Sequence, residues 1–262
     1  MSTGKPIRRV LFLVDHYVDP YGGTEGQLHA LLGALPSHIR AEMWVLRNES
    51  DWLSQNPFPC RTRLLGLGPL ARLGTLLRLA GLARAIRRFD LVQTVFNDAS
   101  LVGPVLGALS GVPVLVSRRD LGFWETPAWR LLLRRTQRLA RGVVANCRAV
   151  ADHVIEVEHV PPTALDVVGN GHDPTRFDVE PAPNLRTELG IPAEAPLVGL
   201  LANVKPLKRH DDLLAAVAQL AANGTDLHLL CIGDVVESDR PLPERAAALG
   251  IADRVHHLTA LG

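Results

Sequence analysis

The 262-residue sequence has few cysteines, lysines and aromatic residues, and it has no long apolar run. Its three cysteines, Cys60, Cys147 and Cys231, lie far apart without a C-x-x-C pair, which disfavours a disulfide framework or a structural zinc site. The first apolar run, Val10–Val14, is too short for a signal peptide or a membrane span. With 47% hydrophobic and 21% charged residues, the composition is that of an ordinary globular protein, and we expect it to be cytoplasmic.

The net charge of +1 conceals an asymmetry between the two parts of the chain. Residues 1–150 hold 20 Lys+Arg against 10 Asp+Glu, and residues 151–262 hold 8 against 17. This division predicts two domains with different surfaces, either with the first attracted to an anionic partner or with the two attracted to each other. Nucleic acid is not expected as a partner, because the basic part lacks interleaved aromatic residues and recognised nucleic-acid motifs.

The hydrophobic pattern predicts an α/β fold with parallel sheets, because strand-length apolar runs alternate with helical segments. In the first domain, residues 1–168, helices are expected to cover both faces of the sheet. The expected strands there are 9–14, 41–46, 90–95, 112–116, 142–145 and 165–168, and the expected helices are 24–36, 70–88, 99–110, 126–141 and 149–158.

A segment rich in proline and glycine, 169–196, is expected to link the two domains. After it the pattern restarts with strands at 197–202, 227–232 and 254–258 and helices at 211–222 and 242–249. Doubly wound sheets usually continue to five or six strands, so the second domain, 197–262, is expected to be a partial one.

Two glycines, Gly22 and Gly23, stand where the loop after the first strand meets a helix. Adjacent glycines permit positive φ and a close approach of a ligand, and the free N–H groups of a helix start can hold an anion. The loop matches neither G-x-G-x-x-G nor a Walker loop. A plain flexible turn, with Thr24 capping the helix, is the other interpretation. His16 lies in the same loop and could contact a ligand.

Three cations follow the first strand of the second domain: Lys205, Lys208 and Arg209, with Asp211 as the expected helix cap. Cations are unfavourable at a helix start unless an anion compensates them, so a diphosphate site is favoured over a set of solvated charges. In the first domain, Arg118, Arg119 and Asp120 follow a strand. They could form a structural salt bridge or line the ligand cleft.

His256 and His257 are expected to point to opposite faces of a strand, which disfavours a metal site shared between them.

An ordered set of motifs resembles family 4 of the retaining nucleotide-sugar glycosyltransferases, whose fold is the two-domain GT-B fold. The matching segments run from Gly22 to Asp234 and cover nearly the whole chain. They are Gly22-Gly23-Thr24-Glu25, Asp90-Leu-Val-Gln93, Gly111-Val-Pro113, Val144-Ala-Asn-Cys-Arg-Ala149, Val168-Gly-Asn-Gly-His-Asp-Pro-Thr-Arg-Phe177, Asn203-Val-Lys-Pro-Leu-Lys208 and Cys231-Ile-Gly-Asp234.

The resemblance implies that the second domain binds a nucleoside-diphosphate sugar and that the first presents a glycan or lipid-linked acceptor. The residues that it implicates in the donor phosphates are Gly22, Gly23, Asn203, Lys205 and Lys208. Gly233 and Asp234 would contact the nucleotide, and Asp120 and Arg119 would lie near the reacting sugar. Fixed positive charge would stabilise the leaving diphosphate, so the reaction is expected to need no metal or other cofactor. No D-x-D pair is arranged to hold a metal.

The chain departs from the family pattern at three places. Asn203 stands where many members have an arginine, whose charge Lys205 could supply, and Arg209 replaces a common glycine. The Glu-x7-Glu segment that holds the donor sugar would lie beyond Gly262, so the resemblance implies a truncated second domain, as a fragment or with a partner supplying the remainder. We therefore expect little or no activity from these 262 residues, and an unpaired strand edge that favours self-association.

Two other functions stay open. One is a non-catalytic fragment or subunit that binds an acceptor or a partner chain, and the other is a GT-B-fold sugar-nucleotide epimerase.

One helix of the first domain is unusually rich in arginine. At helical spacing, Arg130, Arg134, Arg138 and Arg141 are expected to line its outward face, opposite Trp129, Leu132, Leu133, Thr136, Leu139 and Ala140. An ordinary surface helix is one interpretation. The other is peripheral docking of the first domain on the anionic inner face of a membrane, without insertion.

Overall fold

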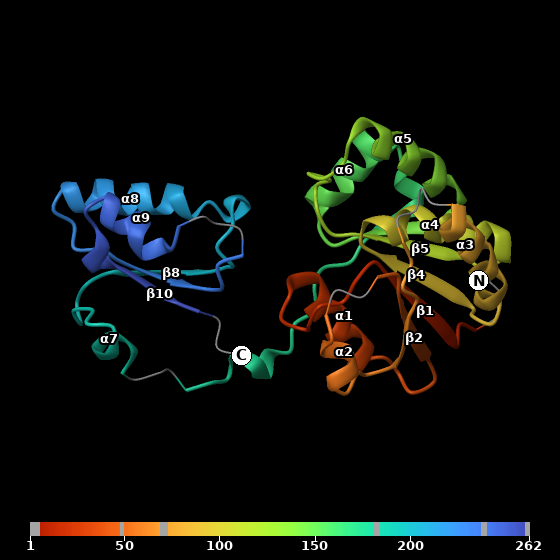
Figure 1. The fold of residues 1–262 in the computed structure, drawn as a ribbon, viewed down its shortest axis with the longest axis horizontal. Coiled ribbons are helices and arrows are strands. Elements are labelled where there is room, and N and C mark those ends of the chain that lie inside the picture. The colour runs from red at the N-terminus through yellow and green to blue at the C-terminus, as the bar shows by residue number, and fades with distance from the viewer. Residues whose placement is uncertain (1–5, 48–49, 69–72, 181–183, 237–239, 260–262) are drawn as a thin grey trace. The chain divides into compact units, whose positions relative to one another are not determined.

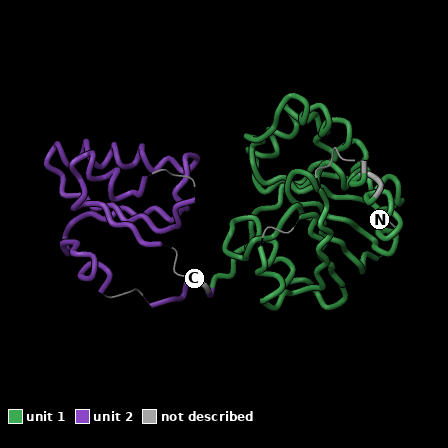
Figure 2. Tube along the Cα trace, viewed as in Figure 1, with its two compact units in different colours: residues 1–174 green, residues 175–262 purple. Residues whose placement is uncertain are grey.

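The computed structural model describes residues 6–47, 50–68, 73–180, 184–236 and 240–259. The chain divides into two compact units, residues 1–174 and residues 175–262 (Figure 2). The division falls inside the segment 169–196 that the sequence marks as a linker. Among the described residues, no helix is both long enough and apolar enough to cross a membrane.

Unit 1 is built on a sheet of seven parallel strands in the order β3-β2-β1-β4-β5-β6-β7 (Figure 1). The strands are β1 (Arg9–Val14), β2 (Arg40–Val45), β3 (Arg61–Leu64), β4 (Leu91–Val95), β5 (Val114–Arg118), β6 (Gly142–Ala145) and β7 (Leu165–Val167). The helices are α1 (Gly23–Gly33), α2 (Trp52–Gln55), α3 (Leu73–Ile86), α4 (Asn97–Ser110), α5 (Pro127–Thr136) and α6 (Arg148–Glu158).

Both faces of this sheet are covered, as the sequence predicts. Side chains alternate along β1, so Leu11 and Leu13 pack into one core with α3, α4 and α6. Val10, Phe12 and Val14 pack into a second core on the opposite face, with α1 and α2. β1 is therefore buried on both faces, which explains its continuous apolar sequence.

Two elements of unit 1 are not expected from the sequence. β3 has the sequence Arg-Thr-Arg-Leu and is mostly exposed at the edge of the sheet, so it carries no apolar run. Helix α2 has only four residues, too few for a helical period. The residues 70–72 of the expected helix 70–88 lie outside the described residues. The helix expected at 126–141 ends at Thr136 and continues as a 3-10 turn, Gln137–Leu139.

Unit 2 has three parallel strands in its described part, in the order β10-β9-β8, so β8 and β10 form the edges of this sheet. They are β8 (Leu197–Leu201), β9 (His228–Ile232) and β10 (Val255–Leu258). α8 (His210–Ala222) and α9 (Leu242–Ala248) lie on the same side of this sheet (Figure 1), and a short α7 (Leu185–Glu188) precedes it. Leu214 and Val217 of α8 share one apolar core with Leu229 and Cys231 of β9.

The strand order of unit 1 reverses between β1 and β4. In doubly wound sheets, ligands bind outside the carboxyl ends of the strands at such a reversal. The loops that follow β1, β4 and β5 are therefore the place to look for a site in unit 1.

Candidate functional site

A small cavity of about 110 Å³ lies at the carboxyl ends of these strands. It is lined by Thr24, Phe96, Asn97, Ser117, Arg118, Arg119, Asp120, Trp124, Glu125 and Glu158. The structure thus brings the start of α1 together with the segment after β5, two regions that the sequence indicates separately.

Gly22 and Gly23 form the start of α1, but not in the expected conformation. Gly22 is the N-cap residue, with φ −67° and ψ 151°, and neither glycine has a positive φ. Thr24 lies inside the helix, so its expected role as the cap is wrong. Apart from its chain neighbours and the adjacent backbone of α1, no atom of the described residues lies within 4 Å of the position that a Cβ on Gly23 would take. The first turn of α1 is therefore open to a ligand beside Gly23.

Phe96 is a site residue that the sequence analysis missed. It follows β4, adopts φ 73° as the N-cap of α4, and stacks on His16 with 4.5 Å between ring centroids. A positive φ in a bulky residue is strained by about 1–3 kcal/mol and is concentrated at functional sites. Its place directly after β4, at the strand reversal, is the signal that could have revealed it.

Asp15 joins the loop after β1 to the start of α4. Its buried carboxylate accepts hydrogen bonds from the backbone N–H groups of Asp98, at 2.8 Å, and Ala99, at 2.6 Å. Burial raises the pKa of Asp15 from 3.8 to about 6, against the opposing effect of these two hydrogen bonds. The contact fixes the positions of two loops that border the cavity.

Asp120 and Arg119, the proposed reactive pair, are each held by neighbours. Oδ1 of Asp120 accepts hydrogen bonds from the backbone N–H of Gly122, at 2.7 Å, and from Trp124 Nε1, at 3.0 Å. Arg119 donates to Oδ1 of Asn170 at 2.6 Å, and burial lowers the pKa of its guanidinium. Gly122 has φ +65°, a conformation that favours glycine in this tight loop. Both side chains are thus oriented before any ligand binds.

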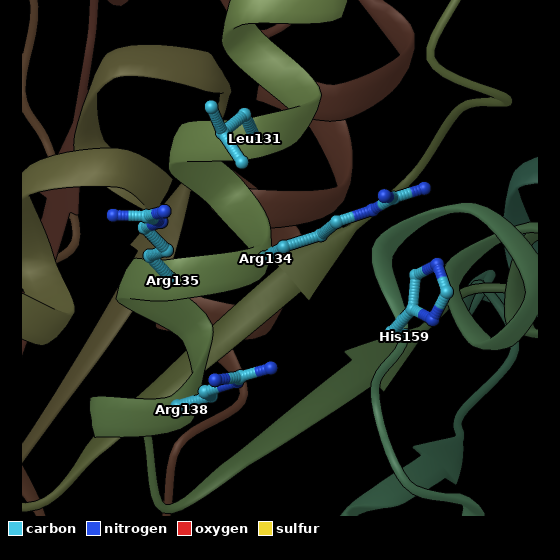
Figure 3. A pocket seen from close by; sticks show the side chains of 5 residues that line it. All are labelled: Leu131, Arg134, Arg135, Arg138 and His159. Carbon is cyan, nitrogen blue, oxygen red and sulfur yellow. The ribbon is translucent and has the colours of Figure 1, made fainter.

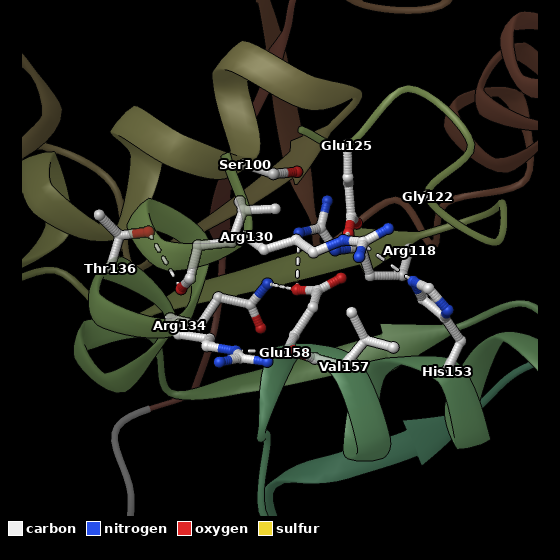
Figure 4. Close-up of polar contacts among 12 residues, drawn as sticks. Ser100, Arg118, Gly122, Glu125, Arg130, Arg134, Thr136, His153, Val157 and Glu158 are labelled. Carbon is white, nitrogen blue, oxygen red and sulfur yellow. Dashed lines mark hydrogen bonds and ion pairs between the residues drawn. The ribbon is translucent and has the colours of Figure 1, made fainter. Parts of the chain in front are cut away.

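Arg118 forms a structural ion pair, but with Glu158 of α6 rather than with Asp120 (Figure 4). The two groups lie 2.8 Å apart and are both buried, and Gln137 also donates to Glu158. Burial raises the pKa of Glu158. Near this pair, the buried Glu125 lies 3.3 Å from Arg130 and 3.8 Å from His153.

Glu125, His153 and Glu158 could hold a metal ion by geometry, since one ligand atom of each lies within 4.8 Å of the others. Arg118 and Arg130, however, already balance the two carboxylates. A divalent cation would therefore bring two uncompensated charges into a buried site, which is unfavourable. We interpret the cluster as an ion-pair network that joins the loop after β5 to α5 and α6.

The expected orientation of the arginine-rich helix is wrong for two of its arginines. Arg130 pairs with Glu125, and Nε of Arg134 donates to the carbonyl of Val157 at 2.8 Å. Arg138 and Arg141 are exposed as expected. On the face expected to be apolar and inward, Leu133 is buried, whereas Leu132 and Leu139 are 47% and 49% exposed. The helix packs through Leu133 and Arg134, because the carbonyls at the end of α6 attract a cation.

In unit 2, the predicted nucleotide residues converge at the carboxyl ends of β8 and β9. The backbone N–H of Asp234 lies 3.3 Å from Oδ1 of Asn203, and the N–H of Val204 donates to the carbonyl of Asp234 at 2.8 Å. Gly233 has φ +151°, and a Cβ there would lie 2.3 Å from the carbonyl oxygen of Ala202. Only glycine lets the two loops approach this closely.

Lys205 and Lys208 flank a 3-10 turn, Pro206–Lys208, in which the N–H of Lys208 donates to the carbonyl of Lys205 at 2.9 Å. Lys205 is half-buried and Lys208 is exposed. A cavity of about 880 Å³ in unit 2 contains Lys205 but not Lys208 in its lining. The other lining residues are Val204, Pro206, Asp211, Ala215, Val236, Arg240, Arg245, Ala248 and Leu249.

Arg209, not Asp211, is the N-cap residue of α8, so the expected cap is wrong. Arg209 has φ 57°, and its guanidinium pairs with Asp212 at 2.6 Å, while Asp211 pairs with Arg245. The two neighbouring histidines of β10 do point apart, as expected: His256 contacts His228 at 3.1 Å, and His257 contacts the carbonyl of Gly233 at 2.8 Å.

Curated proteins of known name are similar to this chain in sequence. A D-inositol 3-phosphate glycosyltransferase of Thermobispora bispora is 29% identical over 187 residues, which cover 64% of this chain and 44% of that protein. A 2-deoxystreptamine glucosyltransferase of Streptomyces kanamyceticus is 27% identical over 222 residues, covering 77% of this chain and 57% of that protein. The chain thus spans about half the length of these curated relatives.

Among solved structures, Anabaena Alr3699/HepE in complex with UDP superposes with a TM-score of 0.78 at 23% identity, over 97% of this chain and 70% of that one. The same protein has also been solved with UDP-glucose. This likeness shows that the fold is of the GT-B type. The model of the glycosyl transferase 4-like domain matches residues 22–171, which include the glycine loop, the cavity and Asn170. Because this match extends over more than half of the sequence, the chain belongs to the glycosyl transferase 4-like domain family.

Proposed function

We propose that this chain takes part in the transfer of a hexose from a nucleoside-diphosphate sugar to an acceptor, with retention of the anomeric configuration. The observation that carries the proposal is the convergence of Asn203, Gly233 and Asp234 beside Lys205. Gly233 follows β9, and Lys205 follows the neighbouring strand β8. Together they form a polar, open edge of the sheet, where a nucleotide can lie against the backbone.

The proposed donor site uses fixed positive charge. Lys205 and Lys208 would bind the diphosphate and stabilise the charge that develops on it as the bond to the sugar breaks. Asn203, an uncharged residue, would hydrogen-bond a phosphate oxygen. In unit 1, the start of α1 at Gly22 and Gly23 offers backbone N–H groups that can also bind a phosphate. With these groups in place, we propose that the reaction needs no metal. UDP and UDP-glucose are the first ligands to test, because the Anabaena structures contain them.

The cavity in unit 1 suits an acceptor that bears hydroxyl groups. Asp120 can accept a proton from, or hydrogen-bond to, an attacking hydroxyl, and Arg119 supplies positive charge beside it. Two relatives are named for D-inositol 3-phosphate and 2-deoxystreptamine. We propose a polyhydroxylated acceptor, either a glycan or the sugar of a lipid-linked carrier.

A donor-consumption assay distinguishes this proposal from the two alternatives. The chain is incubated with UDP-glucose, with UDP-N-acetylglucosamine and with GDP-mannose, and the products are followed by phosphorus and proton NMR. Release of the nucleoside diphosphate together with a sugar product of retained configuration supports a retaining transferase. A new sugar nucleotide without diphosphate release would identify an epimerase. Because we expect little activity from these residues, even slow release of the diphosphate counts for the transferase, and only binding of the nucleotide with no detectable reaction would favour a non-catalytic binding chain.

A further inference from the structure

Unit 1 has a second open cavity, of about 500 Å³, that shares no lining residue with the cavity at the strand ends. It is lined by Leu131, Arg134, Arg135, Arg138 and His159 (Figure 3). Its volume lies within the range of roughly 300–1,000 Å³ that is typical of small-molecule sites. Four of the five lining residues carry nitrogen donors and none carries a carboxylate.

Two of these arginines face the same way. Arg134 and Arg138 are four residues apart, and in Figure 3 both side chains extend from successive turns towards the side on which His159 lies. Arg135 leaves the helix on its other side and borders the cavity there. Arg134 is held in place by the hydrogen bond from its Nε to the carbonyl of Val157 at 2.8 Å. Among the residues that the structure describes, none bonds to its two terminal amino groups, which can therefore bind a ligand.

No residue that lines this cavity carries a carboxylate, and Glu158, which lines the cavity beside it, is already paired with Arg118. In the described part of the chain, neither Arg135 nor Arg138 takes part in an ion pair. The carbonyls at the end of α6 carry only about half a negative charge. The guanidinium groups of Arg134, Arg135 and Arg138 therefore leave a large excess of positive charge at the cavity. Arg134 and Arg138, four residues apart, also repel each other. An anion would remove that repulsion.

His159 adds a hydrogen-bond donor to the cavity, and the backbone conformation at this position does not explain why the residue is histidine. It ends α6 in the left-handed conformation, with φ 59° and ψ 35°, where glycine would be the least strained residue. The side chain is exposed at the cavity. Replacing His159 with glycine would therefore relieve backbone strain and at the same time remove a donor from the cavity.

A further cavity of about 230 Å³ shares Arg134, Arg138 and His159 with the first. Beyond these three, most of its lining is apolar: Ala140, Gly142, Val143, Val160, Pro161 and Ala164, with Gln137 and Glu158 as the polar members. The cationic residues thus stand between an open cavity and an apolar one. This arrangement suits a ligand with an anionic group attached to an apolar group.

We propose that Arg134, Arg138 and His159 bind the phosphate of a phosphate monoester, whose attached group enters the neighbouring apolar cavity. A phosphate monoester carries a charge of about −1.5 to −2 at pH 7 and has three acceptor oxygens. One guanidinium group can donate two parallel hydrogen bonds to two of these oxygens. The phosphate can belong to a free metabolite or to the headgroup of a lipid. The proposal does not depend on sugar transfer.

Two ligands distinguish these sources. Phenyl phosphate, a soluble monoester with an apolar group, is titrated into the chain by calorimetry, with inorganic phosphate as the comparison. Phosphatidylcholine vesicles with and without phosphatidic acid are tested by co-sedimentation. We expect phenyl phosphate to bind more tightly than inorganic phosphate. Binding to phosphatidic-acid vesicles without binding of phenyl phosphate would assign the site to a lipid headgroup. Binding of neither ligand would overturn the proposal.

Matched variants locate the binding. Arg138→Gln, at an exposed position that does not threaten folding, is expected to weaken binding about tenfold, because it removes a charged hydrogen bond. Arg141→Gln removes the same charge outside the cavity and is expected to leave binding unchanged. His159→Gly is expected to weaken binding without lowering the thermal unfolding midpoint. Lys205→Ala/Lys208→Ala is expected to retain binding. If the Arg138 and Arg141 variants lost affinity for the ligand equally, or if the lysine variant lost affinity, the ligand would not be bound at this cavity.

Discussion

The backbone N–H of Asp234 lies 3.3 Å from the side-chain oxygen of Asn203, and this contact adds to the backbone hydrogen bonds that join the loops after β8 and β9. Gly233 makes this contact possible, because its missing side chain leaves room for the carbonyl of Ala202. The two loops form the edge at which we place the nucleotide.

Gly233→Ala is expected to destabilise the protein by about 1–3 kcal/mol, through backbone strain and collision with Ala202. Urea unfolding, followed by circular dichroism, measures the change. Gly199→Ala in β8 is the control, because its φ is not positive and, apart from its chain neighbours, no atom of the described residues lies within 4 Å of the new methyl group. Equal stability of the two variants would show that the loops do not need this close approach.

Glu158→Ala is expected to cost about 3–5 kcal/mol, because it leaves the buried Arg118 without its partner. Asp212→Ala breaks the exposed pair with Arg209 and is expected to change stability by only about 0–1 kcal/mol. Both are measured by urea unfolding. A cost for Glu158→Ala as small as that of the exposed pair would show that the buried network contributes little.

Asp15 makes stability depend on pH in a direction set by its raised pKa of about 6. The folded protein binds this proton more tightly than the unfolded chain does, so the stabilisation is complete below pH 3.8 and is lost as pH rises through about 6. Asp15→Asn should therefore gain stability relative to the wild type as pH rises across this window. The gain is on the order of 3 kcal/mol.

The measurement for Asp15 is urea unfolding of both proteins at several pH values. Above the window, the difference between them should stay constant. A difference that shrinks as pH rises would show that the ionised carboxylate, with its two hydrogen bonds to α4, is the preferred form in the folded protein.

Asp120→Asn tests the proposed role of the carboxylate, which is to accept a proton from, or hydrogen-bond to, the attacking hydroxyl. The amide oxygen can still accept from Gly122 and Trp124, so the fold should persist. The wild-type rate of donor consumption, which we expect to be low, should fall by about 10²-fold or more. The assay of donor consumption supplies the rate, and Asp152→Asn, exposed on α6, supplies the control. An unchanged rate would remove Asp120 from the chemistry.

Most of the strands and helices could be predicted because their apolar residues repeat at the period of the element. β1 and β9 are clear cases, since continuous apolar runs indicate strands buried on both faces. β3 could not be predicted, because an exposed edge strand of alternating arginines has no such signal. An exposed edge strand such as β3 thus forms because it pairs with the neighbouring strand, and its own sequence does not indicate it.

The candidate site was only partly predictable. The rule that ligands bind at the carboxyl ends of strands indicated the glycine loop and the Arg118–Asp120 segment. It could not indicate that Arg118 pairs with Glu158, 40 residues away, since partners of buried charges depend on packing. For the same reason, helical spacing on α5 misplaced Arg130 and Arg134, whose partners lie on the preceding loop and on α6.

The central claim, a nucleoside-diphosphate site on unit 2, is tested most directly by calorimetric titration of UDP. We expect UDP to bind the wild-type chain, and Lys205→Ala/Lys208→Ala to weaken binding at least about tenfold, since each charged hydrogen bond contributes about 1.5–3 kcal/mol. Arg141→Gln/Arg148→Gln, which removes two exposed charges from unit 1, should leave the affinity unchanged. Equal affinity for UDP in the wild type and in the lysine variant would contradict the claim.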